Sequence, residues 1–283
     1  MKIRTVILVT LLLTISTAPF HYDGMASQAP NSKTDILYVG GTGPGNYSTI
    51  QAAVDAANSG DTVFVYDESS PYLENINISK PISVIGENRY TTEIRSNPEQ
   101  DNIVIYCDNA YVANFNLTTE ESGAGGISIE GSYNTVVNCT IFGNDSGYGG
   151  FFISTRFSNH TAESSSSNNI SHCIITDSYG VLVLDSDNNM FYRNTFSNNY
   201  GFILILSNNT VVSQNNFLHK QERYVRFVMS YRNKWSGNYW ERTFVSLPKV
   251  LLGIQLIIIG NKLSVAYPGI QFDWNPAHTP YDW

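Results

Sequence analysis

Charged residues are scarce in this chain of 283 residues, and cysteine and histidine are scarcer still. Charged side chains make up 14% of the sequence, against roughly 25% in an average soluble protein. Acidic residues outnumber basic ones, so the formal net charge is −8. Because a phosphate backbone is bound by clustered cations, this balance argues against a nucleic-acid partner.

Motifs for metals and cofactors are missing as well. The 3 cysteines include no CxxC pair, and no two of the 5 histidines have the i, i+2 or i, i+4 spacing of a metal site. The glycine-rich loop Gly40–Gly45 lacks the Lys-Ser/Thr of a phosphate-binding loop and does not fit the dinucleotide fingerprint. We therefore expect no bound cofactor and no metal.

Long hydrophobic runs occur only near the two ends of the chain. At the N-terminus, Lys2 and Arg4 precede an apolar run over residues 6–15, which has the charge and length of a secretory signal. We predict a signal peptide over residues 1–27, with an uncleaved membrane anchor as the alternative. Either outcome predicts a secreted or cell-surface protein.

In place of charge the sequence has amides, because Asn residues outnumber the 16 Lys and Arg residues. Asn-rich segments recur between Ile103 and Trp240. They end on apolar residues that are 24, 34, 21 and 21 positions apart, namely Leu117, Ile141, Ile175, Phe196 and Phe217. Self-similarity at a period of roughly 20–30 residues is typical of a solenoid.

A second set of apolar segments lies between the Asn-rich ones. It comprises Ile103–Ile105, Ile127–Ile129, Phe151–Ile153, Val181–Val183 and Phe202–Leu204. A glycine precedes each of the last four, at positions 126, 150, 180 and 201. We predict that each coil has one strand after a Gly turn and another in its Asn-rich segment, with alternate side chains pointing inward.

The segment before these repeats carries a more specific resemblance. Its runs Tyr47-Ser-Thr-Ile-Gln-Ala-Ala-Val-Asp-Ala-Ala, Gly60-Asp-Thr-Val-Phe-Val and Lys80-Pro-Ile-Ser-Val-Ile-Gly-Glu87 resemble the opening of pectin-lyase-like right-handed parallel β-helix proteins. The resemblance implies that a helix predicted over residues 49–57, with Ser48 as its N-cap, covers the open end of the solenoid. The predicted fold class is all-β: a single right-handed parallel β-helix over residues 36–240, after a polar leader at residues 28–35.

Residues 241–283 are predicted to form a C-terminal cap and tail. The apolar run Val250–Ile259 is too short for a membrane span, and Gly253 and Gln255 interrupt it. We interpret it as a buried cap, with a membrane contact as the less favoured alternative, and expect the aromatic tail to fold back across the last coil. The endings Asn-Tyr-Trp and Pro-Tyr-Asp are similar to those of archaeal secreted NosD-like proteins, which are accessory to copper-enzyme maturation.

One column of the repeat alignment contains Phe115, Cys139, Cys173, Asn194, Asn215 and Asn238. Stacked amides can donate and accept from coil to coil, so we interpret the Asn residues as an internal ladder rather than as ligand contacts. Stacked strands lie about 4.8 Å apart, so a disulfide bond between Cys139 and Cys173 is within reach. Three cysteines are equally compatible with no disulfide.

The candidate catalytic residues are Glu130, Asp185, Asp187 and Arg193, all near the middle coils. Polysaccharide lyases and glycoside hydrolases on this fold use clustered carboxylates. However, Asp185 and Asp187 precede two Asn residues and have the character of turn residues. No stretch matches an active-site motif, so the leading hypothesis is a non-catalytic protein.

The expected role is to present a polar face that binds carbohydrate or another cell-surface polymer. Tyr and Asn side chains suit sugars, through ring stacking and amide hydrogen bonds. The alternatives are a polysaccharide lyase or glycoside hydrolase, and a NosD-like accessory protein. Asn144 and Asn159 lie in glycosylation sequons, the second within a polar insertion at residues 159–167 that is either a functional loop or a disordered bulge. We expect a monomer with no stable membrane span in the mature chain.

Overall fold

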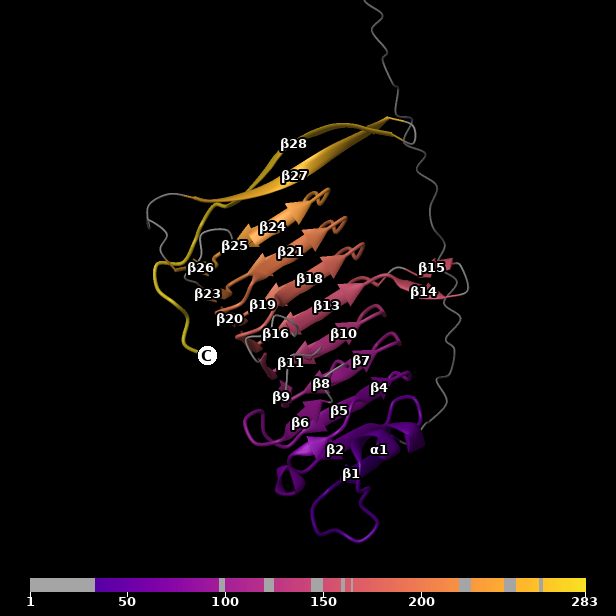
Figure 1. The fold of residues 1–283 in the computed structure, drawn as a ribbon. Helices are drawn as coiled ribbons and strands as arrows, with labels where there is room; N and C mark the ends of the chain where they lie inside the picture. The colour runs from indigo at the N-terminus through magenta and orange to yellow at the C-terminus, as the bar shows by residue number, and fades with distance from the viewer. Residues whose placement is uncertain are drawn as a thin grey trace, which may run out of the picture. The chain divides into compact units, whose positions relative to one another are not determined.

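The computed structural model describes residues 34–96, 100–119, 125–143, 150–158, 161–163, 165–218, 225–241, 248–259 and 262–283. These residues form a parallel β-solenoid whose coils turn in the right-handed sense (Figure 1). Its strands pair in parallel with strands of the neighbouring coils. The signal peptide predicted over residues 1–27 and the sequons at Asn144 and Asn159 lie outside the described residues.

Three strand positions recur from coil to coil. The first holds β4 (Ile76–Ile78), β7 (Ile103–Ile105), β10 (Ile127–Ile129), β13 (Gly150–Ser154), β18 (Gly180–Leu184), β21 (Gly201–Ile205) and β24 (Val225–Val228). The second holds β1 (Ile36–Val39), β2 (Thr62–Val65), β5 (Ser83–Gly86), β8 (Tyr111–Ala113), β11 (Thr135–Val137), β16 (Asn169–Ser171), β19 (Met190–Tyr192), β22 (Val211–Ser213) and β25 (Lys234–Ser236). The third holds β3 (Tyr72–Leu73), β6 (Glu93–Ser96), β9 (Asn116–Thr119), β12 (Thr140–Phe142), β17 (Ile174–Thr176), β20 (Thr195–Ser197), β23 (Asn216–Leu218) and β26 (Tyr239–Trp240).

The prediction of two strands per coil is wrong, because each Asn-rich segment contains two strands rather than one. A residue with φ between 53° and 65° separates them, and in successive coils this residue is Asn114, Asn138, His172, Arg193 and Gln214. A backbone in the left-handed region cannot continue as an extended strand. Each segment therefore bends there into two short strands on different sides of the solenoid.

Helix α1 (Ile50–Ala56) lies at the N-terminal end, where the resemblance placed a cap. Its buried side chains Ile50, Ala53 and Val54 form one stripe. The N-cap is Thr49, whose hydroxyl accepts the backbone N–H of the third helical residue at 3.3 Å, so the prediction of Ser48 is wrong by one residue. A short 3-10 turn, η1 (Asp67–Ser69), follows β2. Within the described ranges, no helix is long and apolar enough to cross a membrane.

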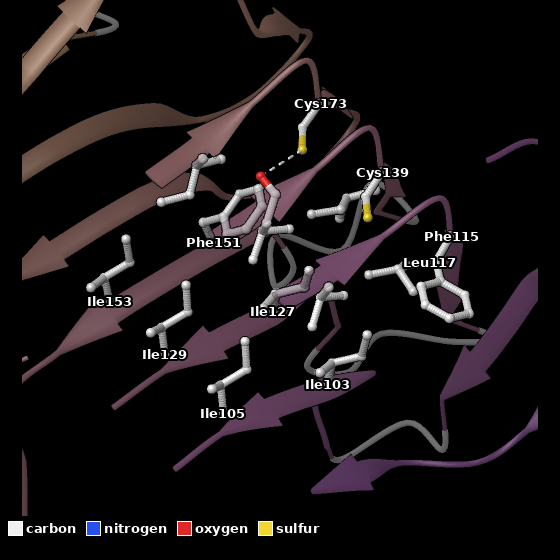
Figure 2. Packing of buried hydrophobic residues seen from close by; sticks show 14 of the residues in the cluster. Ile103, Ile105, Phe115, Leu117, Ile127, Ile129, Cys139, Phe151, Ile153 and Cys173 are labelled. Carbon is white, nitrogen blue, oxygen red and sulfur yellow. Dashed lines mark hydrogen bonds between the residues drawn. The ribbon is translucent and has the colours of Figure 1, made fainter. Parts of the chain in front are cut away.

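The interior consists of columns of similar side chains. One column contains Ile103, Ile127 and Phe151 from three successive coils, and another contains Ile105, Ile129 and Ile153 (Figure 2). These pairings confirm the predicted register of the first strand position, because each residue is paired with the one that the sequence alignment placed opposite it.

Toward the C-terminal end the interior becomes aromatic. Phe196, Phe217 and Trp240 stack in one column, with ring centroids 5.1 Å and 4.2 Å apart. Phe202 packs edge-on against the first two rings. Stacked and edge-on pairs are the favoured arrangements of aromatic rings, so this end of the solenoid has a well-packed core.

The predicted Asn ladder is confirmed at the bend between the second and third strand positions. Asn194, Asn215 and Asn238 are all fully buried. Nδ2 of Asn194 donates to Oδ1 of Asn215 at 3.1 Å, and Nδ2 of Asn215 donates to Oδ1 of Asn238 at 3.0 Å. Asp273 ends the ladder, because its Oδ2 accepts from Nδ2 of Asn238 at 2.9 Å and from Nε1 of Trp240 at 3.1 Å.

A second amide ladder, which the sequence did not reveal, precedes the second strand position. Oδ1 of Asn134, Asn168 and Asn189 accepts a backbone N–H from the preceding coil at 2.8, 2.9 and 3.0 Å, respectively. All three residues are buried. A buried N–H without a partner is costly, so these amides stabilise the turns before the second strand position. The two ladders together flank β19, with Asn189 before it and Asn194 after it.

A hairpin of β27 (Lys249–Ile259) and β28 (Lys262–Asp273) covers the last coil (Figure 1). The prediction of a buried cap is right for one face of it and wrong for the other. Leu251 is buried against the coil, whereas Val250 and Leu252 are exposed. The reason is that successive side chains of a strand point to opposite faces.

The polar insertion at residues 159–167 contributes one strand to a second, shorter hairpin. Its strands β14 (Arg156–Ser158) and β15 (Thr161–Glu163) pair in antiparallel fashion. A paired strand thus lies within the segment that was expected to be a loop or a disordered bulge. The chain rejoins the solenoid at Ser165, whose buried hydroxyl donates to the carbonyl of Gly131 at 2.8 Å.

Candidate functional site

The acidic residues singled out from the sequence do not come together. Asp185 is exposed in the turn after β18 and has a φ of 49°. Oδ1 of Asp187 accepts from the backbone N–H of Asn208 at 2.6 Å and from its Nδ2 at 3.1 Å. Both are turn residues, and the Asp187 carboxylate holds the corresponding turn of the next coil. Glu130 follows β10, which is two coils away from β18.

Arg193 lies at the opposite end of β19 from these turns. Its Nε donates to Oε1 of Gln214 at 3.2 Å. The guanidinium carbon lies 4.9 Å from the ring centre of Tyr192 and 5.4 Å from that of Trp283. An amide and two aromatic rings therefore position this guanidinium, and strand β19 separates it from Asp185 and Asp187.

Arg193 belongs to an outward column of half-buried residues, one per coil, which comprises Asn114, Asn138, His172, Arg193 and Gln214. Backbone bonds keep the column in register, since the N–H groups of Asn138 and His172 each donate to a carbonyl of the next coil at 3.1 Å. The side chains are also linked, because Nδ2 of Asn138 donates to Oδ1 of Asn114 at 2.8 Å.

Arg89 reaches the same column from the loop between β5 and β6. Its Nη1 donates to Oδ1 of Asn138 at 2.7 Å, and its Nη2 donates to the carbonyl of Cys139 at 3.3 Å. The guanidinium also lies 5.3 Å from the ring centre of Tyr90. We call Arg89, His172 and Arg193 the basic strip.

Both arginines of the basic strip act electrostatically on His172. Its ring packs edge-on against Tyr192, with centroids 6.1 Å apart. The pKa of His172 is lowered, first because burial removes water from the ring and then because Arg193 and Arg89 oppose a further positive charge. An anion bound at the strip would relieve this repulsion.

The C-terminal tail completes one side of the basic strip. The backbone N–H of Tyr281 donates to Oδ1 of Asn216 at 2.8 Å, and its carbonyl accepts from Nδ2 of Asn216 at 2.9 Å. Its hydroxyl donates to the carbonyl of Gly237 at 2.6 Å. Trp283 stacks on Tyr281 with ring centroids 4.2 Å apart. As expected, the tail folds back along the last coils (Figure 1) and brings an indole ring beside Arg193.

Cys139 and Cys173 lie one residue further along the chain than the outward column and point into the core from adjacent coils (Figure 2). Both are thiols in this structure, with no disulfide bond between them. Burial raises the pKa of the Cys173 thiol well above its ordinary value, and its Sγ donates to the carbonyl of Ser171 at 3.3 Å. The disulfide bond between Cys139 and Cys173 stays a prediction.

Stacked parallel coils, a capping helix and internal amide ladders define a right-handed parallel β-helix protein. The chain belongs to the right-handed β-helix family, whose sequence profile matches residues 36–217. This match confirms the resemblance found at the N-terminal segment. Among the described residues there is no group of three His, Cys, Asp or Glu side chains that could hold a metal ion, and the narrower NosD-like resemblance stays a prediction.

Several solved structures are similar to this chain at low identity. A pectin methylesterase from carrot is 15% identical, with a TM-score of 0.46 over 74% of this chain and 84% of its own. A pectin methylesterase from Erwinia chrysanthemi is 11% identical, with a TM-score of 0.44 over 75% and 73%. A pectate lyase is 16% identical, with a TM-score of 0.38 over 75% and 72%. These likenesses are too distant to indicate a substrate, and no curated protein matches the chain.

Proposed function

We propose that the protein is a secreted or cell-surface monomer that binds an acidic polysaccharide along the basic strip without cleaving it. The observation that carries the proposal is that Arg89, His172 and Arg193 share one surface of a chain with a net charge of −8. A uronate polymer presents a carboxylate on every sugar, and stacked coils present side chains about every 4.8 Å. Because the polymer repeats its carboxylates and the solenoid repeats its coils, several carboxylates can contact one face of the protein.

The side chains around the strip supply the other contacts that a sugar needs. A guanidinium is a planar fork that pairs with a carboxylate through two hydrogen bonds. The amides of Asn138 and Gln214 can bond hydroxyl groups, and the rings of Tyr192 and Trp283 offer flat apolar surfaces to a pyranose. Because Gln214 and the two rings already hold Arg193, little of its side-chain freedom is lost on binding.

The scattered positions of the acidic candidates favour binding over catalysis. Cleavage of a glycosidic bond by acid–base chemistry needs two groups that act on the same bond. Asp187 is engaged with Asn208, while Glu130 follows a strand two coils away. The proposal of export rests on the charged and apolar pattern of residues 1–27.

Titration calorimetry with polygalacturonate, and with neutral dextran for comparison, tests the proposal. Arg193→Ala is expected to weaken polygalacturonate binding about tenfold or more, because a hydrogen bond to a charged group contributes about 1.5–3 kcal/mol. Arg226→Ala is the matched control, since it removes the same charge from the exposed outer side of β24. Equal losses in both variants, or equal binding of dextran, would mean that the strip is not the site.

The enzymatic alternative is tested on the same samples. Incubation with polygalacturonate, followed by assays for unsaturated and for reducing ends, should show no new ends over the protein-free control. Their appearance would replace the binding role by a lyase or a hydrolase, respectively.

A further inference from the structure

The hairpin of β27 and β28 carries a second surface, which the proposed sugar-binding role does not use. Its base is attached to the coils, where Gly253 and Ile254 pair with β24 and Asp273 pairs with Trp235. Beyond this base the two strands pair with each other as far as Ile259 and Lys262. They run past the end of β24 (Figure 1), so the far half of the hairpin projects from the stack.

The inner face of the hairpin is committed to the last coil. Nε2 of Gln271 donates to the carbonyl of Ser230 at 2.9 Å, and Oε1 of Gln271 accepts from Nε1 of Trp235 at 2.7 Å. At Gly253 a Cβ atom would lie 2.3 Å from the carbonyl oxygen of Phe227, so only a glycine fits there. This face is closed to any other partner.

The outer face is apolar and uncovered. Leu252 and Ile270 lie directly opposite each other across the hairpin, and 63% and 56% of their surfaces are exposed. Val250 and Ile254 flank Leu252 on the same face and are also exposed. An apolar surface of this extent on a soluble domain marks an interaction site.

The charge of the segment indicates which partner fits this surface. Before Asp273 the hairpin contains no Asp or Glu, whereas it contains Lys249, whose Nζ lies 5.7 Å from the ring centre of Trp240, and Lys262 at the projecting end of β28. A second copy of the chain would bring two such positive hairpins together, and like charges oppose association. An anionic bilayer instead offers acyl chains to the apolar side chains and phosphate groups to the cations.

We propose that the hairpin docks the protein onto an anionic lipid bilayer, with its outer face lying in the plane of the membrane interface. A spanning arrangement is excluded, because an open two-stranded hairpin would leave unpaired backbone groups in the hydrocarbon. Trp274 directly follows β28, is exposed, and stacks on Phe272 with ring centroids 4.7 Å apart. Aromatic rings of this kind prefer the level of the headgroups.

Vesicle flotation of the full chain tests the docking. The parent protein should float with vesicles of phosphatidylcholine and phosphatidylglycerol, and the double variant Leu252→Asn, Ile270→Asn should bind at least about tenfold more weakly, since each buried CH₂ contributes to partitioning. Leu73→Asn is the matched control, because Leu73 is 65% exposed on β3 and should bind like the parent. Because all three substituted side chains are exposed, the variants should unfold at the same midpoint as the parent, and this measurement verifies that they are folded.

A local readout is needed because the full chain also contains the apolar run of residues 6–15. Hydrogen–deuterium exchange should show slower exchange in peptides covering 249–259 and 262–273 when the vesicles are added. Three results would overturn the proposal. They are protection confined to the N-terminal peptides, equal binding to pure phosphatidylcholine, and a dimer in sedimentation that the double variant abolishes while no vesicle is bound.

Discussion

Asn215→Ala removes the central amide of the confirmed ladder, and its cost can be worked out from the partners that it leaves. Oδ1 of Asn215 accepts both the backbone N–H of Asn194 at 2.8 Å and its Nδ2 at 3.1 Å. Nδ2 of Asn215 donates to the carbonyl of Phe191 at 3.0 Å and to Oδ1 of Asn238 at 3.0 Å. All of these groups lie inside the solenoid, where water cannot replace the lost amide without a cavity.

The magnitude follows from what happens to each partner. The backbone N–H of Asn194 loses its acceptor, Oδ1 of Asn215, and an unpaired buried donor costs about 1–3 kcal/mol. The Nδ2 group of Asn194 keeps the carbonyl of Ile170 at 2.9 Å, and Oδ1 of Asn238 keeps the backbone N–H of residue 215 at 3.0 Å. Adding the net loss of the remaining bonds, at about 0.5–1.5 kcal/mol each, gives a destabilisation of about 3 kcal/mol.

Urea unfolding followed by tryptophan fluorescence measures this loss, because Trp235 and Trp240 are buried in the adjoining coil. Asn77→Ala is the control, since the Asn77 side chain is exposed on β4 and its loss should change the free energy of unfolding by less than about 0.5 kcal/mol. If Asn215→Ala costs no more than Asn77→Ala, the amide ladder does not stabilise the coil stack and the reasoning is refuted.

Three further predictions concern the core and the titratable groups. Phe202→Ala should lower the free energy of unfolding by about 3–5 kcal/mol in the same assay, because this buried ring packs edge-on against Phe191, Phe196 and Phe217; a loss below about 1 kcal/mol would contradict that packing. Burial raises the pKa of Asp101, which the hydroxyl of Ser128 opposes by donating to the carboxylate. The folded state therefore binds a proton on Asp101 more tightly than the unfolded state does. The stability that this proton contributes is lost as the pH rises through the raised pKa. Asp101→Asn should consequently be more stable than the parent near pH 7 but not near pH 3. A bound polyanion would raise the lowered pKa of His172, so polygalacturonate affinity in calorimetry should increase as the pH falls from 7.5 to about 5.5, and His172→Gln should remove that pH dependence.

The strand register could be predicted from the sequence because one side-chain position in every two is buried. Gly150 shows why the glycines are reliable markers. It has a φ of 121°, and a Cβ atom there would lie 2.0 Å from the carbonyl oxygen of Gly180 in the next coil. Such a close approach of two backbones excludes any other residue, so the glycine repeat and the apolar repeat specify the same stacking.

The bend that creates the third strand, and with it the basic strip, could not be predicted in the same way. Asn and His are both enriched at positive φ, but the equivalent position after His172 holds Arg193 and Gln214, which have no such preference. Tertiary stacking imposes the conformation on them. Arg89 joins the strip from 49 positions away, through its bond to Asn138, and no local pattern contains that contact.

The carboxylate of Asp273 gives the solenoid a defined last coil. The Nδ2 group of each Asn in the ladder donates to the next residue toward the C-terminus, so the series has a direction and its last Asn always has a donor that needs an acceptor. A carboxylate can accept but cannot donate, and Asp273 therefore terminates the series where another Asn would have called for a further coil. The hairpin that carries Asp273 is thus a chemical stop as well as a lid. Coils could be added or lost in the middle of the stack during evolution without changing how it ends.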